Sequence, residues 1–403
     1  MRTRFAWILG VAALISVALL LACSTKYSSS NNGLVVVSTQ GNANMDTFSL
    51  DLGNGHITQI FNTAGPPTNG QPTAVVLDPA GAYAYVMIYQ SAAVNNSATG
   101  IESFQIASDG KLGSGTTYTL NGGVTPVAMV MDSAGKFLFV ADSTPPAVSV
   151  LAVGSGGALT EVAGSPFPVA ELPGGVTQGQ TPSPSALAIS PTAYPPAYAT
   201  CSGNVPPTTE NLYVTDAANY VVLNYSVSSA GALTAVSENA TGTTPSGVTV
   251  DPCNRFVYVS NSQPDNSVSA FTICNSISLP TCPNADYSLL PVSSTLATTG
   301  NNPGPLLMDA YANFLYVLNT RGTSISAFKV STTTGSLTPL SPTPVTTNAY
   351  PTSMAIRSDD SWLFVTNLNS ANLSQYAITP STGALIPQAP VQTDNFPWGV
   401  AVK

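Results

Sequence analysis

The chain has 403 residues, of which 44% are hydrophobic and only 7% are charged, and its formal net charge is −9 at pH 7. Nucleic-acid binding depends on clustered Lys and Arg, so ten such residues in the whole chain exclude a nucleic-acid partner. With so few charges, the surface must be built mainly from Ser, Thr, Asn and Gly.

The N-terminus is typical of an export signal. Arg2 and Arg4 precede an apolar run from Phe5 to Leu21, and Leu20-Leu-Ala-Cys23 resembles a bacterial lipobox. We expect residues 1–22 to be a lipoprotein signal peptide, Cys23 to be lipidated, and residues 23–33 to be a flexible tether. Ser24 resembles the residue of lipoproteins sent to the outer membrane of Gram-negative bacteria, facing the periplasm or the surface. An uncleaved membrane anchor is the alternative.

Seven prolines recur along the rest of the chain at intervals of 46 to 61 residues. They are Pro72, Pro126, Pro184, Pro245, Pro303, Pro351 and Pro397. Each opens a short β-type run, and regular self-similarity of this length indicates a repeat architecture.

Each repeat contains the signals of four strands. The first run ends at a turn such as Asp78-Pro-Ala-Gly81, and a second contains an aromatic residue followed by valine, as at Tyr258-Val259. The third alternates apolar and polar residues, as at Val268, Phe271 and Ile273, and the fourth follows a Gly-x-Leu turn. Four strands in about 50 residues are typical of a propeller blade. The repeat that begins at Pro184 carries an insertion between its first two strands.

The two ends of the chain together complete one further repeat. Residues 34–61 supply strands two, three and four, and residues 397–402 supply a first strand. We therefore predict an all-β, seven-bladed β-propeller over residues 34–403, with four antiparallel strands in each blade. Pairing of the C-terminal strand into the N-terminal blade would close the ring and leave no exposed ring edge.

On these residues the chain resembles the lactonase-like, YVTN-repeat family of seven-bladed β-propellers. The resemblance rests on the repeated proline, the Asp78–Gly81 turn, and the motifs that end at Asn261, Asn319 and Asn367. It implies the propeller fold for the whole of residues 34–403. Lactone hydrolysis is the activity that the family name implies, although such motifs specify the fold and not the chemistry.

The recurring acids and amides favour a structural interpretation. Asp78, Asp132 and Asp251 begin turns, where a side-chain carboxylate accepts backbone hydrogen bonds. The second strands end at Asp142, Asp216 and, in other repeats, at asparagine. A side chain that caps the following turn would serve every blade equally at this position. A catalytic residue is usually unique in a repeat protein.

Residues with catalytic potential are few. We expect the top face, made of the loops between strands two and three and between blades, to carry Arg321 with the acids Asp142, Asp216, Asp265 and Asp394. A carboxylate with Arg321 could activate water against a lactone without a metal. The single histidine, His56, occupies a turn position that varies between repeats. No nucleophile elbow, zinc motif or phosphate loop is present, so we predict no cofactor and no metal.

Four cysteines remain after the N-terminal segment, and they allow three pairings. An exported protein favours disulfides. We favour Cys274 with Cys282, and Cys201 with Cys253, since the second pair would fasten the insertion of the fourth blade to the first turn of the fifth.

The main functional prediction is a lipid-anchored binding module at the cell envelope, with a glycan or protein partner. Its loops carry the candidate ligand-binding aromatics Tyr89, Tyr194 and Trp398. The alternative is a hydrolase of the 6-phosphogluconolactonase-type family acting on a sugar lactone or similar ester. A cell-envelope scaffold without a small ligand is the third interpretation. In each case the lipid anchor is the only contact with the membrane.

Overall fold

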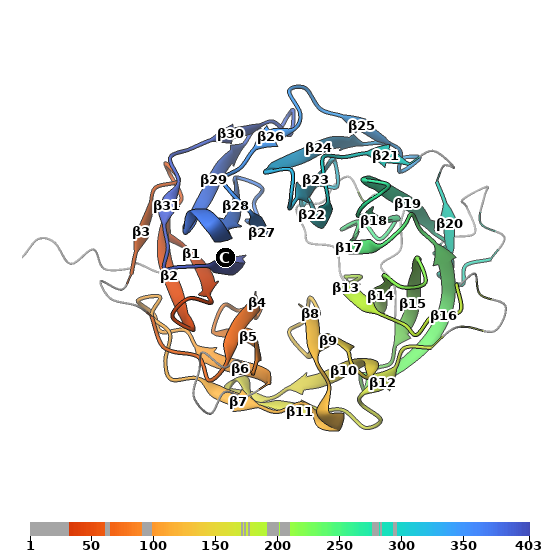
Figure 1. Ribbon diagram of the computed structural model, residues 1–403, viewed down its shortest axis with the longest axis horizontal. Coiled ribbons are helices and arrows are strands. Elements are labelled where there is room, and N and C mark those ends of the chain that lie inside the picture. Colours follow the sequence, from red (N-terminus) through yellow and green to blue (C-terminus); the bar gives the residue numbers. More distant parts are fainter. Residues whose placement is uncertain are drawn as a thin grey trace, which may run out of the picture.

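Seven antiparallel β-sheets surround a central axis in the computed structural model (Figure 1). The structure describes residues 32–60, 65–90, 99–170, 172, 175, 178–191, 201, 210–275, 282, 284–292 and 296–403. The predicted fold, an all-β propeller of seven four-stranded blades, is confirmed. The expected signal peptide, Cys23 and nearly all of the tether lie outside the described residues. Within those residues, no helix has the length and apolar character needed to cross a membrane.

Each blade begins with an inner strand and ends at the rim with a fourth strand, which is split in two in blades three, five, six and seven. Blade one contains β32 (Pro397–Val402), β1 (Asn32–Thr39), β2 (Asn44–Asp51) and β3 (Ile57–Gln59). Blade two contains β4 (Gln71–Leu77), β5 (Tyr83–Tyr89), β6 (Gly100–Gln105) and β7 (Thr116–Tyr118). Blade three contains β8 (Pro126–Met131), β9 (Phe137–Ser143), β10 (Pro146–Val153), β11 (Leu159–Glu161) and β12 (Phe167–Pro168). Blade four contains β13 (Pro184–Ile189), β14 (Glu210–Asp216), β15 (Val221–Val227) and β16 (Leu233–Ala240).

The remaining three blades follow the same order. Blade five contains β17 (Pro245–Val250), β18 (Phe256–Asn261), β19 (Ser267–Ile273), β20 (Leu289–Pro291) and β21 (Ala297–Thr298). Blade six contains β22 (Pro303–Met308), β23 (Phe314–Asn319), β24 (Ser324–Val330), β25 (Leu337–Pro339) and β26 (Val345–Thr346). Blade seven contains β27 (Pro351–Ile356), β28 (Trp362–Asn367), β29 (Asn372–Ile378), β30 (Leu385–Pro387) and β31 (Val391–Gln392). Short 3-10 turns lie at Asn121–Gly123, Ser155–Gly157 and Leu368–Ser370.

The two ends of the chain close the ring, as predicted. Strand β32 pairs antiparallel with β1, and Val36 lies opposite Ala401. Blade one is therefore made from both ends of the chain, and its backbone ladder replaces the open edge that two separate ends would leave.

The repeated prolines stand at or next to the start of each inner strand. Proline lacks an N–H, so it suits a strand whose inner edge has no backbone partner. Hydroxyl groups join these strands instead. Ser185 Oγ donates to the carbonyl of Pro245 at 2.7 Å, and Ser246 Oγ donates to that of Pro303 at 2.7 Å. The inner strands are thus connected around the axis by side chains.

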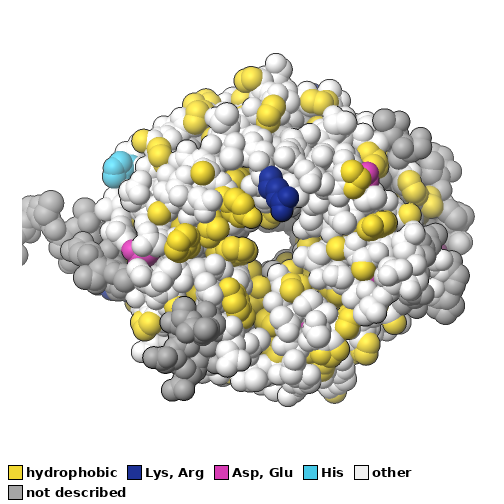
Figure 2. Space-filling model, viewed as in Figure 1, with side chains coloured by type: hydrophobic (Ala, Val, Ile, Leu, Met, Phe, Trp, Pro, Cys, Tyr) yellow, Lys and Arg dark blue, Asp and Glu magenta, His cyan; other side chains and the backbone are white. Residues whose placement is uncertain are grey.

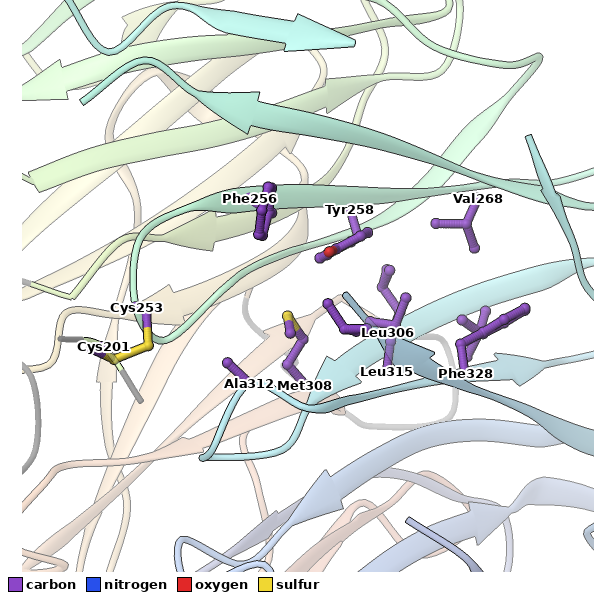
Figure 3. Packing of buried hydrophobic residues seen from close by; sticks show 12 residues of the cluster. Cys201, Cys253, Phe256, Tyr258, Val268, Leu306, Met308, Ala312, Leu315 and Phe328 are labelled. Carbon is purple, nitrogen blue, oxygen red and sulfur yellow. A yellow bond between two sulfur atoms is a disulfide. The ribbon is translucent and has the colours of Figure 1, made fainter. Parts of the chain in front are cut away.

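Neighbouring blades pack through the Gly-x-Leu turns. Tyr258 Oη donates to the carbonyl of Gly335 at 3.0 Å, and Tyr316 Oη donates to that of Gly383 at 2.9 Å. A Cβ atom on Gly335 would overlap the ring of Phe256 in the preceding blade. This close approach, together with a positive φ of 73°, requires glycine at Gly335. Figure 3 shows Phe256 and Tyr258 of blade five facing Leu306, Met308 and Leu315 of blade six.

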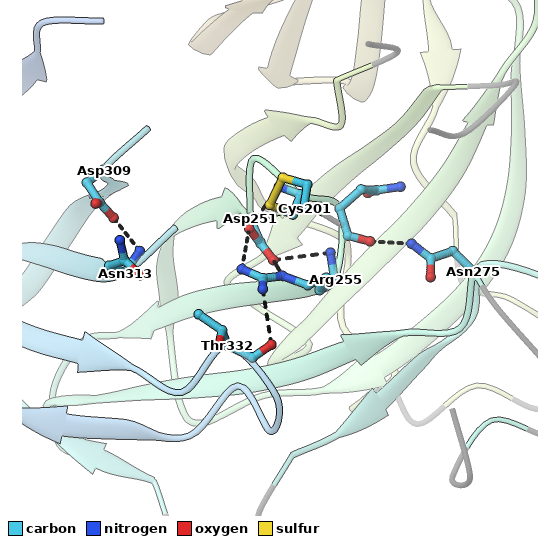
Figure 4. The surroundings of a disulfide bond; sticks show 9 residues. Cys201, Asp251, Arg255, Asn275, Asp309, Asn313 and Thr332 are labelled. Atoms are coloured by element: carbon cyan, nitrogen blue, oxygen red, sulfur yellow. Dashed lines mark hydrogen bonds and ion pairs between the residues drawn. A yellow bond between two sulfur atoms is a disulfide. The ribbon is translucent and has the colours of Figure 1, made fainter. Parts of the chain in front are cut away.

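Both disulfides have the favoured pairing: Cys201–Cys253 and Cys274–Cys282. The first ties the insertion of blade four to the turn between β17 and β18 of blade five. Beside it, Asp251 forms a buried ion pair with Arg255 at 2.5 Å, and Arg255 Nη1 donates to the carbonyl of Thr332 in blade six (Figure 4). Burial raises the pKa of Asp251, and Arg255 partly opposes this rise.

Candidate functional site on the top face

The strand order places two sets of loops on one face, called here the top face. They are the loops between the second and third strands of each blade and the loops that enter each inner strand. Arg321, between β23 and β24, is the only Lys or Arg of the described residues in these loops. Figure 2 looks along the axis and shows sparse charge, with one dark-blue group at the rim of the central opening.

Arg321 is exposed, and the backbone on each side of it is fixed. Thr320 N–H donates to the carbonyl of Asn302 at 3.0 Å, and Asn302 Nδ2 donates to Thr320 Oγ1 at 2.8 Å. Gly322 N–H donates to the carbonyl of Asn319 at 3.0 Å. No ion pair of Arg321 occurs among the residues that the structure describes. The guanidinium is therefore available to an anion or a polarised carbonyl.

A neutral bridge links the segment that holds Asn302 to a loop of the neighbouring blade that contains an acid. Gln263 Nε2 donates to Asn301 Oδ1 at 2.6 Å, which joins the loop between β18 and β19 to the loop that enters β22. In the first of these loops lies Asp265, an exposed residue whose carboxylate accepts from Thr243 N–H at 2.6 Å. Arg321 and Asp265 thus belong to adjacent blades and to the same face.

Asp142 and Asp216 are turned into the fold instead. Asp142 accepts hydrogen bonds from Ser149 N at 3.1 Å and Ser149 Oγ at 2.7 Å. Asp216 accepts from Ser183 N at 2.8 Å and Asn219 Nδ2 at 2.8 Å. Burial raises the pKa of Asp142 to about 7. These acids lie in blades three and four, and the structure does not bring them to Arg321 in blade six.

The corresponding asparagines act in the same way, which agrees with the structural interpretation of the repeats. Asn261 Nδ2 donates to Ser269 Oγ at 3.0 Å, and Asn319 Nδ2 donates to Ser326 Oγ at 3.0 Å. A polar side chain at the end of the second strand therefore fastens the following loop in several blades.

Asp394 lies next to a buried acid that the sequence analysis missed. Asn44 Nδ2 donates to the Asp394 carboxylate at 2.8 Å, and Asp394 N–H donates to Asp46 Oδ2 at 2.8 Å. Asp46 is 1% exposed. Burial raises its pKa to about 6, the hydrogen bond from Asp394 N–H opposes this rise, and the charge of Asp394 adds to it.

A second missed acid, Glu102, occupies the corresponding place in blade two. It accepts from Asn69 N at 3.0 Å and Asn69 Nδ2 at 3.2 Å. Glu102, Asn69 and Pro66 are among the residues that line a cavity of about 400 Å³. The same third-strand position in the other blades holds Ser149, Leu223, Ser269, Ser326 and Ser374. Alignment of the polar positions of the third strands, and not only of the apolar ones, would have found both acids.

The three predicted aromatic residues lie apart. Tyr89 lines a cavity of about 350 Å³ together with Gln90, Thr99 and Thr125. Trp398 is half-buried on β32, and its carbonyl accepts from Thr352 Oγ1 at 2.8 Å. Tyr194 lies outside the described residues.

The described residues contain no cluster of three or more His, Cys, Asp or Glu side chains that could hold a metal ion. His56 is exposed in the turn between β2 and β3, where its Nδ1 lies 3.2 Å from Thr58 Oγ1.

The fold is that of a seven-bladed β-propeller, and part of the sequence is similar to a lactonase family. Residues 283–397 match a family model described as "Lactonase, 7-bladed beta-propeller". This segment contains blades six and seven, with Arg321 and Asp394. No curated protein sequence matches the chain significantly.

Several solved structures share the fold over almost the whole chain. A protein from Lactobacillus plantarum has a TM-score of 0.70 and 16% identity, covering 92% of this chain and 99% of that one. A putative 6-phosphogluconolactonase from Bacteroides fragilis has a TM-score of 0.68 and 15% identity, covering 93% and 99%. The periplasmic gluconolactonase of Pseudomonas aeruginosa has a TM-score of 0.68 and 18% identity, covering 92% and 98%. At these identities the similarity shows the fold alone.

Proposed function

We propose that this protein hydrolyses an unphosphorylated sugar lactone on the top face of the propeller, at Arg321. The observation that carries the proposal is the exposed guanidinium of Arg321. It is the only described Lys or Arg in the top-face loops, and it lies within the segment that matches the lactonase family model. The names of two structural neighbours, a gluconolactonase and a putative 6-phosphogluconolactonase, support this function over the binding module.

The charge of the site selects among lactones. A phosphate dianion is usually bound by several cations or by clustered backbone N–H groups. The described top-face loops supply one cation beside the carboxylates of Asp265 and Asp394 and neutral amides and hydroxyls, a charge balance that disfavours a phosphate, so the substrate is a neutral sugar lactone.

The chemistry requires a base and a group that stabilises negative charge. Asp265 accepts a proton from water, whose oxygen attacks the lactone carbonyl carbon. The carbonyl oxygen becomes negatively charged, and the N–H groups of Arg321 stabilise it. The ring C–O bond then breaks, the leaving ring oxygen takes the proton from Asp265, and the carboxylic acid formed ionises, so that an open-chain aldonate and one proton are released.

The proposal includes the location predicted from the N-terminus. The enzyme would be exported and held by a lipid on Cys23, with its top face open to diffusing sugars of the envelope. The lipid supplies the membrane attachment, and the small lactone is the partner.

The test is hydrolysis of D-glucono-1,5-lactone and its 6-phosphate, followed by proton release at pH 7 above the spontaneous rate. We expect turnover of the neutral lactone, a loss of about 100-fold or more in kcat for Arg321→Ala, and partial activity for Arg321→Lys. Asp265→Asn should lower kcat with little change in KM. Lys329→Ala, which removes a cation at the opposite end of β24, is the matched control and should leave the rate unchanged. Enzyme-dependent turnover that is unaffected by Arg321→Ala would refute the site.

A further inference from the structure

Seven backbone positions in equivalent places encircle the axis on the top face. Each directly precedes the proline of an inner strand. In six blades the carbonyl of this residue accepts a hydrogen bond of 2.8 to 3.0 Å. The donor is the backbone N–H at the end of the second strand of the same blade, or the N–H of the next residue. In blade two, Gln71 pairs with Tyr89 in the same place. In blade order the positions hold Phe396, Gln71, Thr125, Ser183, Thr244, Asn302 and Tyr350.

The two aromatic residues of this ring are exposed. Tyr350 has 44% of its surface accessible and Phe396 has 51%. They are the only described large hydrophobic residues that are exposed in top-face loops, since the other three lie in a bottom turn or on strands. An exposed aromatic ring offers a flat apolar face to a ligand.

The backbone at both aromatics is strained. Tyr350 has φ of 59° and Phe396 has φ of 58°, a region that favours Gly and Asn. Asn302 in the neighbouring blade and Thr244 in blade five also have positive φ, of 55° and 46°. Bulky aromatic residues are disfavoured in this region relative to glycine, and such strain concentrates at binding sites. The fold alone would favour asparagine or glycine.

The aromatics occupy one continuous arc next to Arg321. Their inner strands, β27 and β32, are neighbours, and Thr352 Oγ1 bridges them by a bond of 2.8 Å to the carbonyl of Trp398. On one side of the arc, Asn302 contacts Thr320, the residue before Arg321. On the other side, Gln71 Nε2 donates to Gln40 Oε1 at 3.4 Å. Along the rim, Arg321 is therefore followed by the carboxamide of Asn302, then by Tyr350 and Phe396, and then by the carboxamides of Gln71 and Gln40.

We propose that Tyr350 and Phe396 form a sugar-binding arc for the pyranose rings of a neutral oligosaccharide whose terminal aldonolactone lies at Arg321. The inference rests on the proposed function for the position of the lactone. It assigns the substrate class as lactones of oligosaccharides rather than of single sugars.

The chemistry of the arc suits a glycosyl chain. The C–H groups of a pyranose ring pack on the negative face of an aromatic ring. Carboxamides such as Asn302 and Gln71 both donate and accept hydrogen bonds, as sugar hydroxyls require. The absence of a carboxylate or cation among the seven ring positions favours neutral sugars over uronic acids.

The experiment compares kcat/KM for D-glucono-1,5-lactone with that for the lactones of cellobionic and maltobionic acid. Calorimetric titration with cellotriose and maltotriose, which have no lactone, measures the affinity of the arc for sugar rings alone. We expect one disaccharide lactone to react about tenfold better than gluconolactone, and the matching trisaccharide to bind. Tyr350→Asn and Phe396→Asn should remove both effects and leave gluconolactone turnover within about twofold of the wild-type rate.

The choice of asparagine keeps the variants folded, because Asn302 already adopts this conformation. Tyr311→Asn, at an exposed tyrosine of the bottom face, is the control and should change neither measurement. Arg321-dependent gluconolactone turnover without a disaccharide preference or trisaccharide binding would overturn the sugar-binding arc and leave the proposed function intact. Tyr350-dependent trisaccharide binding without turnover of any lactone would overturn the proposed function and support the arc.

Discussion

Replacing Asp142 by Asn should stabilise the protein at neutral and alkaline pH. Asp142 is fully buried, and its Oδ1 has no hydrogen-bond partner among the described residues. In blades five, six and seven the same position is asparagine, whose Nδ2 donates to serine hydroxyls. Ser149 provides such a hydroxyl in blade three. An amide therefore fits this site without carrying a charge into it.

The size of the stabilisation follows from the raised pKa of Asp142. Burial raises the pKa of Asp142 from 3.8 to about 7, so the folded protein holds a proton that the unfolded chain releases. The wild-type protein is stabilised by this proton below pH 4, and the stabilisation is lost as the pH rises through 7. Each factor of ten in proton affinity is worth about 1.4 kcal/mol, so the loss amounts to roughly 4 kcal/mol at pH 8.

The assay is denaturant unfolding of both proteins between pH 4 and pH 8.5. We expect the advantage of Asp142→Asn to grow by a few kcal/mol across this range, with lactone hydrolysis unchanged. The reciprocal variant Asn319→Asp in blade six is the matched control and should lose stability as the pH rises. Wild-type and Asp142→Asn curves that run parallel at all pH values would refute the reasoning.

Three further predictions concern stability. Tyr316→Phe leaves the Gly383 carbonyl without its hydrogen bond and should lower the free energy of unfolding by about 1–2 kcal/mol in a denaturant titration. Tyr213→Phe removes a buried hydroxyl that has no partner among the described residues, so it should be neutral or stabilising. Asp46→Ser introduces the serine that most other blades have at this position, and its gain in unfolding free energy over the wild type should grow as the pH rises toward 7. The gain should be smaller than for Asp142→Asn, because burial raises the pKa of Asp46 only to about 6. Replacing both cysteines of the Cys201–Cys253 disulfide by serine should cost about 4 kcal/mol in denaturant unfolding, and added reductant should lower the unfolding midpoint less than in the wild type, because only Cys274–Cys282 remains to be reduced.

The repeats made the fold predictable from the sequence. Pro245 and Pro303 lie at the starts of inner strands because proline suits an edge without a backbone partner, and this requirement recurs in every blade. Pro397 belongs to the same column, which indicated ring closure by the last strand. The split of the fourth strand was not predicted, because these rim segments are short and carry no shared motif.

The site was harder to predict because it depends on differences between blades. Arg321 was found, since a cation is rare in this chain. Asp46 and Glu102 were missed because their column was aligned only by its apolar neighbours. Tyr350 and Phe396 gave no local signal. Their importance comes from a backbone conformation with positive φ, and a residue before proline is ordinarily expected to be extended.

The joint construction of blade one sets the order of assembly. Strand β32 is synthesised after every other strand of the described fold, and it pairs with β1, the first of those strands. Until β32 has left the ribosome, β1 exposes an unpaired edge and the inner strand of blade seven lacks its neighbour in blade one. The ring can therefore be completed only after β32 has been synthesised, and a variant without β32 would keep six whole blades while remaining an open, self-associating arc.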